Sequence, residues 1–159
     1  MRKLAFVTAS FAAFALAPTL ADAQSTEAFT KALHIYDSYR VVPNITYLTA
    51  NNWEAKLDVY QARDALTPNP TLIYFHGGGW TAGSKEASSL TFLPFLNMGW
   101  NVVNVEYRLA KVSLAPAAVQ DSLCALRWVY RNGKEYNVDL NRLVVMGNSA
   151  ADTLHLRQE

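Results

Sequence analysis

The chain has 159 residues, a formal net charge of +1 at pH 7 and an apolar content of 51%. This composition supplies the core of one small domain and excludes a disordered chain. Its charges form no basic or acidic block, which argues against nucleic acid and membrane surfaces as partners. The single cysteine, Cys124, excludes an internal disulfide, and the three histidines are too scattered for a metal site. Because Cys124 lies among apolar residues, we expect a packed core thiol rather than a nucleophile.

The first 23 residues have the pattern of a secretory signal peptide. Arg2 and Lys3 give a positive start, residues 4–17 are largely apolar, and residues 21–23 (Ala-Asp-Ala) fit the small-x-small cleavage rule. The apolar run is shorter than the about 20 residues that a membrane span requires. We therefore expect cleavage near Ala23 and a domain of residues 24–159 in the periplasm or outside the cell.

The next part of the chain predicts a helix followed by a β-hairpin. Apolar residues recur at helical spacing over residues 27–39. Residues 44–49 and 55–60 alternate in the manner of strands, and the turn-forming pair Asn51-Asn52 lies between them. A hairpin at this position is expected to lead into the main sheet.

Beyond the hairpin, apolar runs alternate with helical segments. The runs at residues 72–75 and 102–105 are nearly continuous, as in strands covered on both faces, and a third apolar run lies at residues 143–146. Helices are expected over residues 86–97, where Pro94 can bend the helix, and over residues 116–132. The second ends before Gly133 and has one apolar face, formed by Val119, Leu123, Leu126 and Tyr130. The sequence therefore predicts an α/β fold, in which a hairpin leads into a parallel sheet flanked by helices.

Two glycine-containing motifs follow predicted strands. Residues 76–80 (His-Gly-Gly-Gly-Trp) follow the first run, and residues 147–151 (Gly-Asn-Ser-Ala-Ala) follow the last. The first pattern is typical of an oxyanion loop, because glycines let main-chain amides approach a developing negative charge. The second is typical of a nucleophilic serine on a sharp strand-to-helix turn. The alternative for Ser149 is an ordinary serine at a helix N-terminus.

Five segments resemble, in order and spacing, the hormone-sensitive-lipase-like esterases of the α/β-hydrolase fold, and more narrowly bacterial secreted acetylxylan and feruloyl esterases. They are residues 57–60, 76–80, 106–109, 116–121 and 147–150. The resemblance covers residues 44–150, the N-terminal half of the family's domain, so the fold is expected to be incomplete. It implies acyl transfer from an ester to Ser149 and then to water, without a cofactor or a metal.

The resemblance also implies roles for individual residues. Ser149 is the nucleophile, and His76 holds the oxyanion loop rather than acting as a base. Trp80 either forms a wall of the acyl pocket or packs against the protein. The oxyanion hole and its support are formed by the amides of Gly78, Gly79 and Ala150, with His76, Gly77 and Gly147 beside them. Arg108 and Asp121 are expected to form a structural ion pair.

In this fold the catalytic acid and histidine follow the serine along the chain. Only Asp152, His155 and Glu159 follow Ser149, and the first two lie in the helix expected to run away from the active face. We therefore expect this chain, read as truncated after the serine, to be inactive alone, with residues 143–146 as an aggregation-prone edge. The alternative is a non-catalytic remnant or binding module. Expected partners are a small ester or acylated carbohydrate substrate, and a chaperone or complementing C-terminal half.

Overall fold

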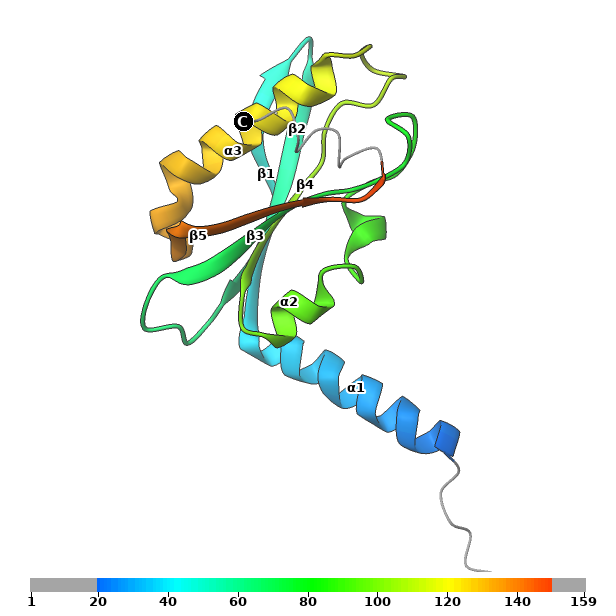
Figure 1. The fold of residues 1–159 in the computed structure, drawn as a ribbon, viewed down its shortest axis with the longest axis vertical. Helices are drawn as coiled ribbons and strands as arrows, with labels where there is room; N and C mark the ends of the chain where they lie inside the picture. The colour runs from blue at the N-terminus through cyan, green and yellow to red at the C-terminus, as the bar shows by residue number, and fades with distance from the viewer. Residues whose placement is uncertain (1–19, 150–159) are drawn as a thin grey trace, which may run out of the picture. The chain divides into compact units, whose positions relative to one another are not determined.

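The computed structural model describes residues 20–149. Its elements are α1 (Leu20–Ser38), β1 (Tyr39–Ala50), β2 (Trp53–Ala62), β3 (Asn69–Phe75), η1 (Glu86–Ser88), α2 (Leu93–Asn97), β4 (Asn101–Val105), α3 (Ala117–Asn132), η2 (Gly133–Tyr136) and β5 (Val138–Gly147) (Figure 1). Two compact units divide the chain between Ala32 and Leu33. Residues 1–19 of the predicted signal peptide lie outside the described residues. Within residues 20–149, no helix is both long and apolar enough to cross a membrane.

The predicted leading helix is confirmed as α1, and it begins earlier, at Leu20. In the first unit, Lys31 Nζ donates to Glu27 Oε1 at 2.6 Å, an exposed pair one helical turn apart. The Phe29 side chain is exposed. Such a surface ion pair contributes only about 0.3–0.5 kcal/mol to helix stability.

The second unit contains a five-stranded sheet in the order β1-β2-β4-β3-β5. β1 and β2 are antiparallel, as are β2 and β4, whereas β3 is parallel to both β4 and β5. Asn51 and Asn52 have φ angles of 52° and 61°, which match the twist that a two-residue hairpin requires. The predicted α/β fold, with a hairpin leading into a parallel sheet, is therefore confirmed.

Side chains alternate between the two faces of the central strands and form a core on each. Ile73 and Phe75 of β3 face the cluster beneath α3, whereas Leu72 and Tyr74 face the cluster that contains Leu96 of α2. Figure 1 shows α3 and α2 on different sides of the sheet. The prediction that these strands are covered on both faces is confirmed.

The prediction of one helix over residues 86–97, even one bent at Pro94, is wrong. The segment forms only a 3₁₀ turn, η1, and the short helix α2, in which Pro94 lies in the first turn. Ser88 Oγ donates to the Ser84 carbonyl at 3.3 Å, and Ser89 Oγ to the Glu86 carbonyl at 3.2 Å. Such side-chain bonds compete with the helical hydrogen bonds of the main chain and explain the break.

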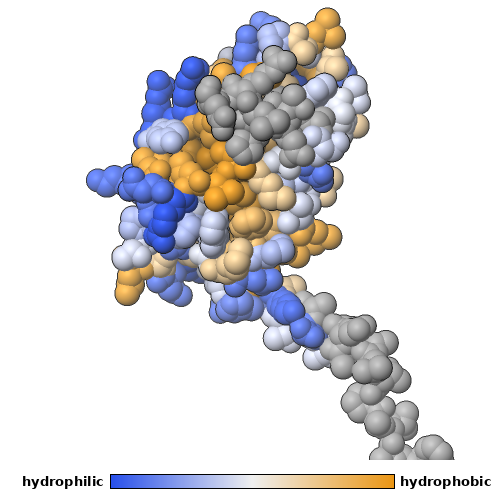
Figure 2. Space-filling model, viewed as in Figure 1, coloured by the Kyte–Doolittle hydropathy of each residue, from blue (hydrophilic) through white to orange (hydrophobic). Residues whose placement is uncertain are grey.

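The described part of the chain leaves β5 at one edge of the sheet, where β3 is its partner. Leu140 and Val144 of this strand are exposed. Figure 2 shows hydrophobic residues gathered on the face where β5 runs. An edge of this kind offers unpaired main-chain groups to another chain. The low solubility expected from the sequence stays a prediction.

Candidate active site

The parallel strands end level with one another. Phe75 of β3 pairs with Val105 of β4 and with Gly147 of β5. The residues that follow these three positions therefore meet at the carboxyl edge of the sheet, the edge where open α/β sheets bind ligands. The two sequence motifs, residues 76–80 and 147–151, both begin at this edge.

The glycine-rich loop turns sharply after His76. Gly78, Gly79 and Trp80 have positive φ angles of 128°, 59° and 61°. The Gly78 carbonyl accepts hydrogen bonds from the amides of Thr81 at 3.1 Å and Ala82 at 3.0 Å. A Cβ atom at Gly78 would lie 2.0 Å from the Ala82 carbonyl oxygen. Both the backbone angle and the space therefore require glycine at position 78.

The loop lies against the turn that carries the predicted nucleophile. A Cβ atom at Gly77 would lie 2.7 Å from the carbonyl oxygen of Asn148, so the two main chains touch. Ser149 is exposed and has a φ of 58°. A non-glycine residue in this region is strained, and such strain gathers at functional sites. Ala150, the predicted third amide donor, lies outside the described residues.

His76 is fully buried beneath the loop. Its Nδ1 lies 2.8 Å from the Gly77 carbonyl oxygen, and its ring stacks on Tyr107 with 4.4 Å between centroids. The Tyr107 hydroxyl donates to the His76 carbonyl at 2.6 Å. These contacts fit a residue that holds the loop, as the resemblance implies, and burial keeps the imidazole from approaching a substrate as a base.

Glu106 has a role in this site that the sequence did not predict. Its Oε1 lies 3.3 Å from His76 Nε2, within ion-pair distance but without hydrogen-bond geometry. Its Oε2 accepts the Lys85 main-chain N–H at 2.8 Å. Glu106 therefore connects the histidine of the loop to the segment that follows the loop. In the sequence, Glu106 was marked only by its position in the family-like segment of residues 106–109. That position does not reveal which residues Glu106 contacts.

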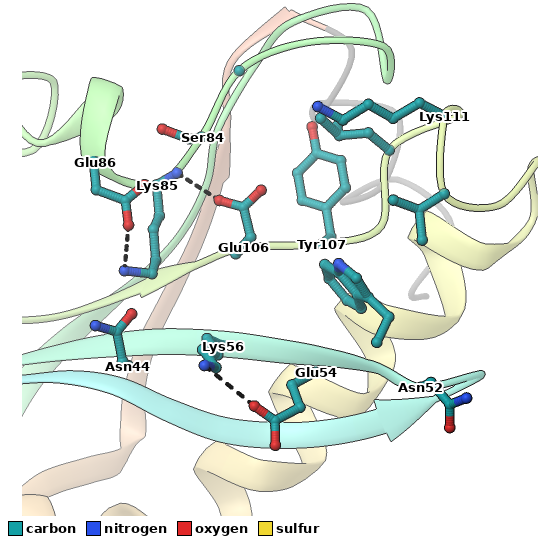
Figure 3. A pocket seen from close by; sticks show the side chains of 14 residues that line it. Asn44, Asn52, Glu54, Lys56, Ser84, Lys85, Glu86, Glu106, Tyr107 and Lys111 are labelled. Atoms are coloured by element: carbon teal, nitrogen blue, oxygen red, sulfur yellow. Dashed lines mark hydrogen bonds and ion pairs between the residues drawn. The ribbon is translucent and has the colours of Figure 1, made fainter.

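Lys85 is the second residue that the sequence did not single out. It is buried, and its Nζ donates to Asp58 Oδ2 at 2.9 Å. The same Nζ donates to Glu86 Oε1 at 2.7 Å, a contact that Figure 3 shows. Desolvation lowers the pKa of Lys85, but the hydrogen bonds to Glu86 and Asp58 outweigh it and raise that pKa. The bond from Lys85 lowers the pKa of Glu86 to about 2. The buried lysine is thus held charged beneath the loop.

The predicted ion pair between Arg108 and Asp121 is confirmed. Arg108 Nη2 donates to Asp121 Oδ1 at 2.7 Å, and Nε donates to Oδ2 at 2.9 Å. The Arg108 main-chain N–H also donates to Oδ2 at 2.9 Å. Both side chains are buried, so the pair fixes the segment after β4 to α3. The side-chain bonds to Asp121 raise the pKa of Arg108.

Two further sequence predictions have different outcomes. Cys124 is only half-buried on α3, so the expectation of a thiol packed in the core is wrong. Trp80 is 39% exposed, and its main-chain carbonyl accepts the Ala110 N–H at 2.7 Å. Its role as a pocket wall stays a prediction.

Over residues 20–149, no group of three or more His, Cys, Asp and Glu side chains could hold a metal ion.

Replacement of Glu106 by glutamine is expected to loosen the oxyanion loop. The variant removes the negative charge that faces His76 while keeping the size of the side chain. Bonds to a charged group contribute about 1.5–3 kcal/mol, so amide hydrogen exchange of residues 77–83 should accelerate about tenfold or more. Nuclear magnetic resonance measures this directly. The matched control is Glu54→Gln, which removes an exposed partner of Lys56 and should leave loop exchange unchanged. Equal exchange rates in both variants would refute the connection.

Alkaline pH is expected to destabilise the fold between pH 10 and pH 12. Burial raises the pKa of Tyr39 to about 12 and that of Tyr107 to about 12. Because the folded state holds these protons more tightly, the stabilisation is complete below pH 10 and is lost as pH rises through 12. Two pKa units correspond to about 2–3 kcal/mol for each tyrosine. Urea unfolding followed by circular dichroism should therefore show a falling midpoint, less steeply in Tyr107→Phe. A midpoint that stays constant over this range would contradict the assignment.

Comparison with known proteins places the chain in a family. The family described as BD-FAE matches residues 57–156, more than half of the chain. Esterase LipI of Mycobacterium tuberculosis (strain ATCC 25618 / H37Rv) is 38% identical over 86 residues, which are 54% of this chain and 27% of LipI. This chain therefore spans about a quarter of the length of that curated relative.

Solved structures of esterases have the same fold. A hyperthermophilic esterase from the archaeon Pyrobaculum calidifontis superposes with a TM-score of 0.65 at 30% identity, over 86% of this chain and 45% of that one. A truncated carbohydrate esterase from gut microbiota gives 0.67 at 27% identity, over 74% and 42%. The matched family region contains the glycine-rich loop, the serine turn and the Arg108–Asp121 pair. The chain belongs to the BD-FAE family of hormone-sensitive-lipase-like α/β-hydrolases.

Proposed function

We propose that this chain supplies the nucleophile and the oxyanion loop of a serine carboxylic-ester hydrolase. One observation carries the proposal: the main chain of Gly77 touches that of Asn148, which places the glycine-rich loop against the exposed, strained Ser149. The similarity of this chain to esterases supports it. An ordinary serine at a helix N-terminus does not need a positive φ angle, so the backbone strain at Ser149 favours the nucleophile over that alternative.

The reaction has two acyl transfers. Ser149 Oγ attacks the ester carbonyl as its proton passes to a base, and the carbonyl oxygen becomes negative. Main-chain amides of Gly78, Gly79 and Ala150 donate to that oxygen, each contributing ~3 kcal/mol to the transition state. The C–O bond to the alcohol breaks as the alcohol takes the proton. Water then attacks the acyl-serine, which releases the acid and restores the hydroxyl.

The base and its acid partner come from outside these 159 residues. In the family the acid and the histidine follow the serine and lie on later loops. Asp152 and His155 lie outside the described residues, and in the sequence they come before the later strands whose loops carry the family's acid and histidine. The 159 residues alone should therefore show at most the residual catalysis of an oxyanion hole, about 10³–10⁴ over water.

The proposed substrate is a small acyl ester on a carbohydrate. The carbohydrate esterase among the solved structures supports this class, because it superposes on 74% of this chain with a TM-score of 0.67. The acyl group is small, such as acetyl. The pattern of residues 1–23 supports action in the periplasm or outside the cell. N-terminal sequencing of protein exported by a bacterial host tests this location, with a start at Gln24 expected and an uncleaved Met1 contradicting it.

Complementation tests the proposed function. The complemented assembly is this chain co-expressed with the C-terminal half of the Pyrobaculum calidifontis esterase, the half in which this fold carries its acid and histidine. We expect it to hydrolyse p-nitrophenyl acetate and an acetylated oligosaccharide, with at most residual hydrolysis by the chain alone or by the Ser149→Ala assembly. A folded assembly without activity would favour the alternative, a non-catalytic binding module of this fold.

A further inference from the structure

A cavity of about 640 Å³ opens beside the candidate active site (Figure 3). Its walls come from the start of β2, the segment that follows the oxyanion loop, and residues 106–112 after β4. Gly83, Glu106 and Tyr107 line it, and these same residues support His76 and the loop. A Cβ atom at Gly83 would lie 2.3 Å from the Gly77 carbonyl oxygen. The cavity and the oxyanion loop therefore share a wall.

Three polar side chains at this cavity are available to a ligand. Within residues 20–149, the amides of Asn44 and Asn52 and the ammonium group of Lys111 form no side-chain hydrogen bond or ion pair with the protein, and all three are exposed. Figure 3 shows them spread around the cavity rather than clustered on one wall. Together they offer both hydrogen-bond donors and acceptors.

The charges that line the cavity balance one another. Lys56 pairs with Glu54 at 3.2 Å and Lys85 with Glu86 at 2.7 Å, while Glu106 and Lys111 add one charge of each sign. This balance gives no electrostatic preference for a phosphate or another strong anion. The polar groups of the walls also disfavour a long acyl chain, because such a chain would displace their water without offering hydrogen bonds in return.

Apolar surface lies between these polar groups. Trp53, which is half-buried, and Val112, which is 44% exposed, both line the cavity. An aromatic face offers a flat apolar platform to a ring that carries polar groups on its edge. Dispersed amides around such a platform match a ligand with many hydroxyl groups and no charge.

We propose that this cavity binds a neutral sugar ring of the substrate's glycan chain. The inference rests on the proposed function and deepens it, because it assigns the carbohydrate a place. The sugar ring lies against Trp53, and its hydroxyl groups bond to Asn44, Asn52 and Lys111. The shared wall at Gly83 and Glu106 then lets a neighbouring esterified sugar extend toward the oxyanion loop. The cavity thus selects glycan esters over simple alkyl esters.

Binding of a glycan that carries no ester tests the cavity separately from catalysis. Isothermal titration of the chain with cellohexaose is expected to show binding, and Ser149→Ala should bind equally well. Trp53→Ala should weaken binding about tenfold or more. The matched control is Trp128→Ala, which removes another half-buried tryptophan, on α3 and outside the cavity lining, and should leave binding unchanged. Circular dichroism of each variant verifies that it is folded.

A second variant keeps the proposal testable if Trp53→Ala does not fold. Asn52→Ala alters only an exposed turn residue at the cavity and should also weaken binding. No binding of cellohexaose by the folded chain would overturn the inference, as would equal losses in Trp53→Ala and Trp128→Ala. Tighter binding of hexagalacturonate, which carries carboxylates, would overturn the assignment to a neutral sugar. Hydrolysis by the complemented assembly without glycan binding would refute this inference alone and leave the proposed function standing.

Discussion

Replacement of Gly78 by alanine is expected to reduce ester hydrolysis by the complemented assembly about 10²–10³-fold, the loss caused by removing an oxyanion-hole donor. Gly78 has a φ of 128°, where side chains are strained, and the new Cβ would lie 2.0 Å from the Ala82 carbonyl oxygen. That oxygen belongs to main chain, so the loop itself must shift. Its amides would then no longer face the reacting oxygen. Steady-state kinetics with p-nitrophenyl acetate should show the loss in kcat rather than in KM.

Gly99→Ala is the matched control for this change. Gly99 also has a positive φ, 79°, but no atom lies within 4 Å of the added Cβ, and the residue lies before β4 at the opposite end of the strand from the site. The substitution should therefore lower stability by about 1 kcal/mol and leave kcat unchanged. If both variants lost activity to the same extent, the cause would be general strain, and the role of the loop would be refuted.

Replacement of Asp121 by alanine is expected to destabilise the fold by about 3–5 kcal/mol. The variant leaves the Arg108 guanidinium buried with no carboxylate, and it removes the acceptor of the Arg108 main-chain N–H. Domains of this size are stable by only about 5–15 kcal/mol, so much of the protein should be unfolded at moderate temperature. Urea unfolding followed by tryptophan fluorescence measures the change.

Two comparisons isolate the buried pair. Glu54→Ala removes the partner of Lys56 at the surface, where such pairs contribute at most about 1 kcal/mol. The double variant Arg108→Met with Asp121→Leu replaces both charges by apolar groups and should recover much of the stability lost in Asp121→Ala. A loss of less than 1 kcal/mol in Asp121→Ala would show that the pair does not anchor α3.

Local patterns were sufficient to predict the hairpin and the central strands. Asn51-Asn52 adopts positive φ angles with little strain, and the apolar runs of β3 and β4 admit few other placements. The pair between Arg108 and Asp121 also followed from their positions in family-like segments. These features depend on residues near in sequence or on a pattern that the family shares.

Features set by tertiary contacts could not be predicted in the same way. The predicted apolar face of α3 included Tyr130, which is 60% exposed, whereas Ala125 and Asp121 are fully buried. Small side chains let the helix approach the sheet, and the hydrogen bonds that Arg108 donates to Asp121 turn that face of the helix inward. The spacing of large apolar residues was the only guide to the buried face of α3, and it therefore predicted the wrong face. The contacts of Lys85 and Glu106 join segments 21 residues apart, and no local pattern reveals them.

The proposed role of Ser149 is tested most directly by labelling with a serine-directed fluorophosphonate, with the adduct located by mass spectrometry. Labelling requires an activated hydroxyl, which in turn needs the serine turn, the oxyanion loop and a base together. We expect an adduct on Ser149 in the complemented assembly, and little or no adduct on the chain alone or on the Ser149→Ala assembly. An adduct on a different serine, or labelling of the chain alone at the rate of the assembly, would contradict this role.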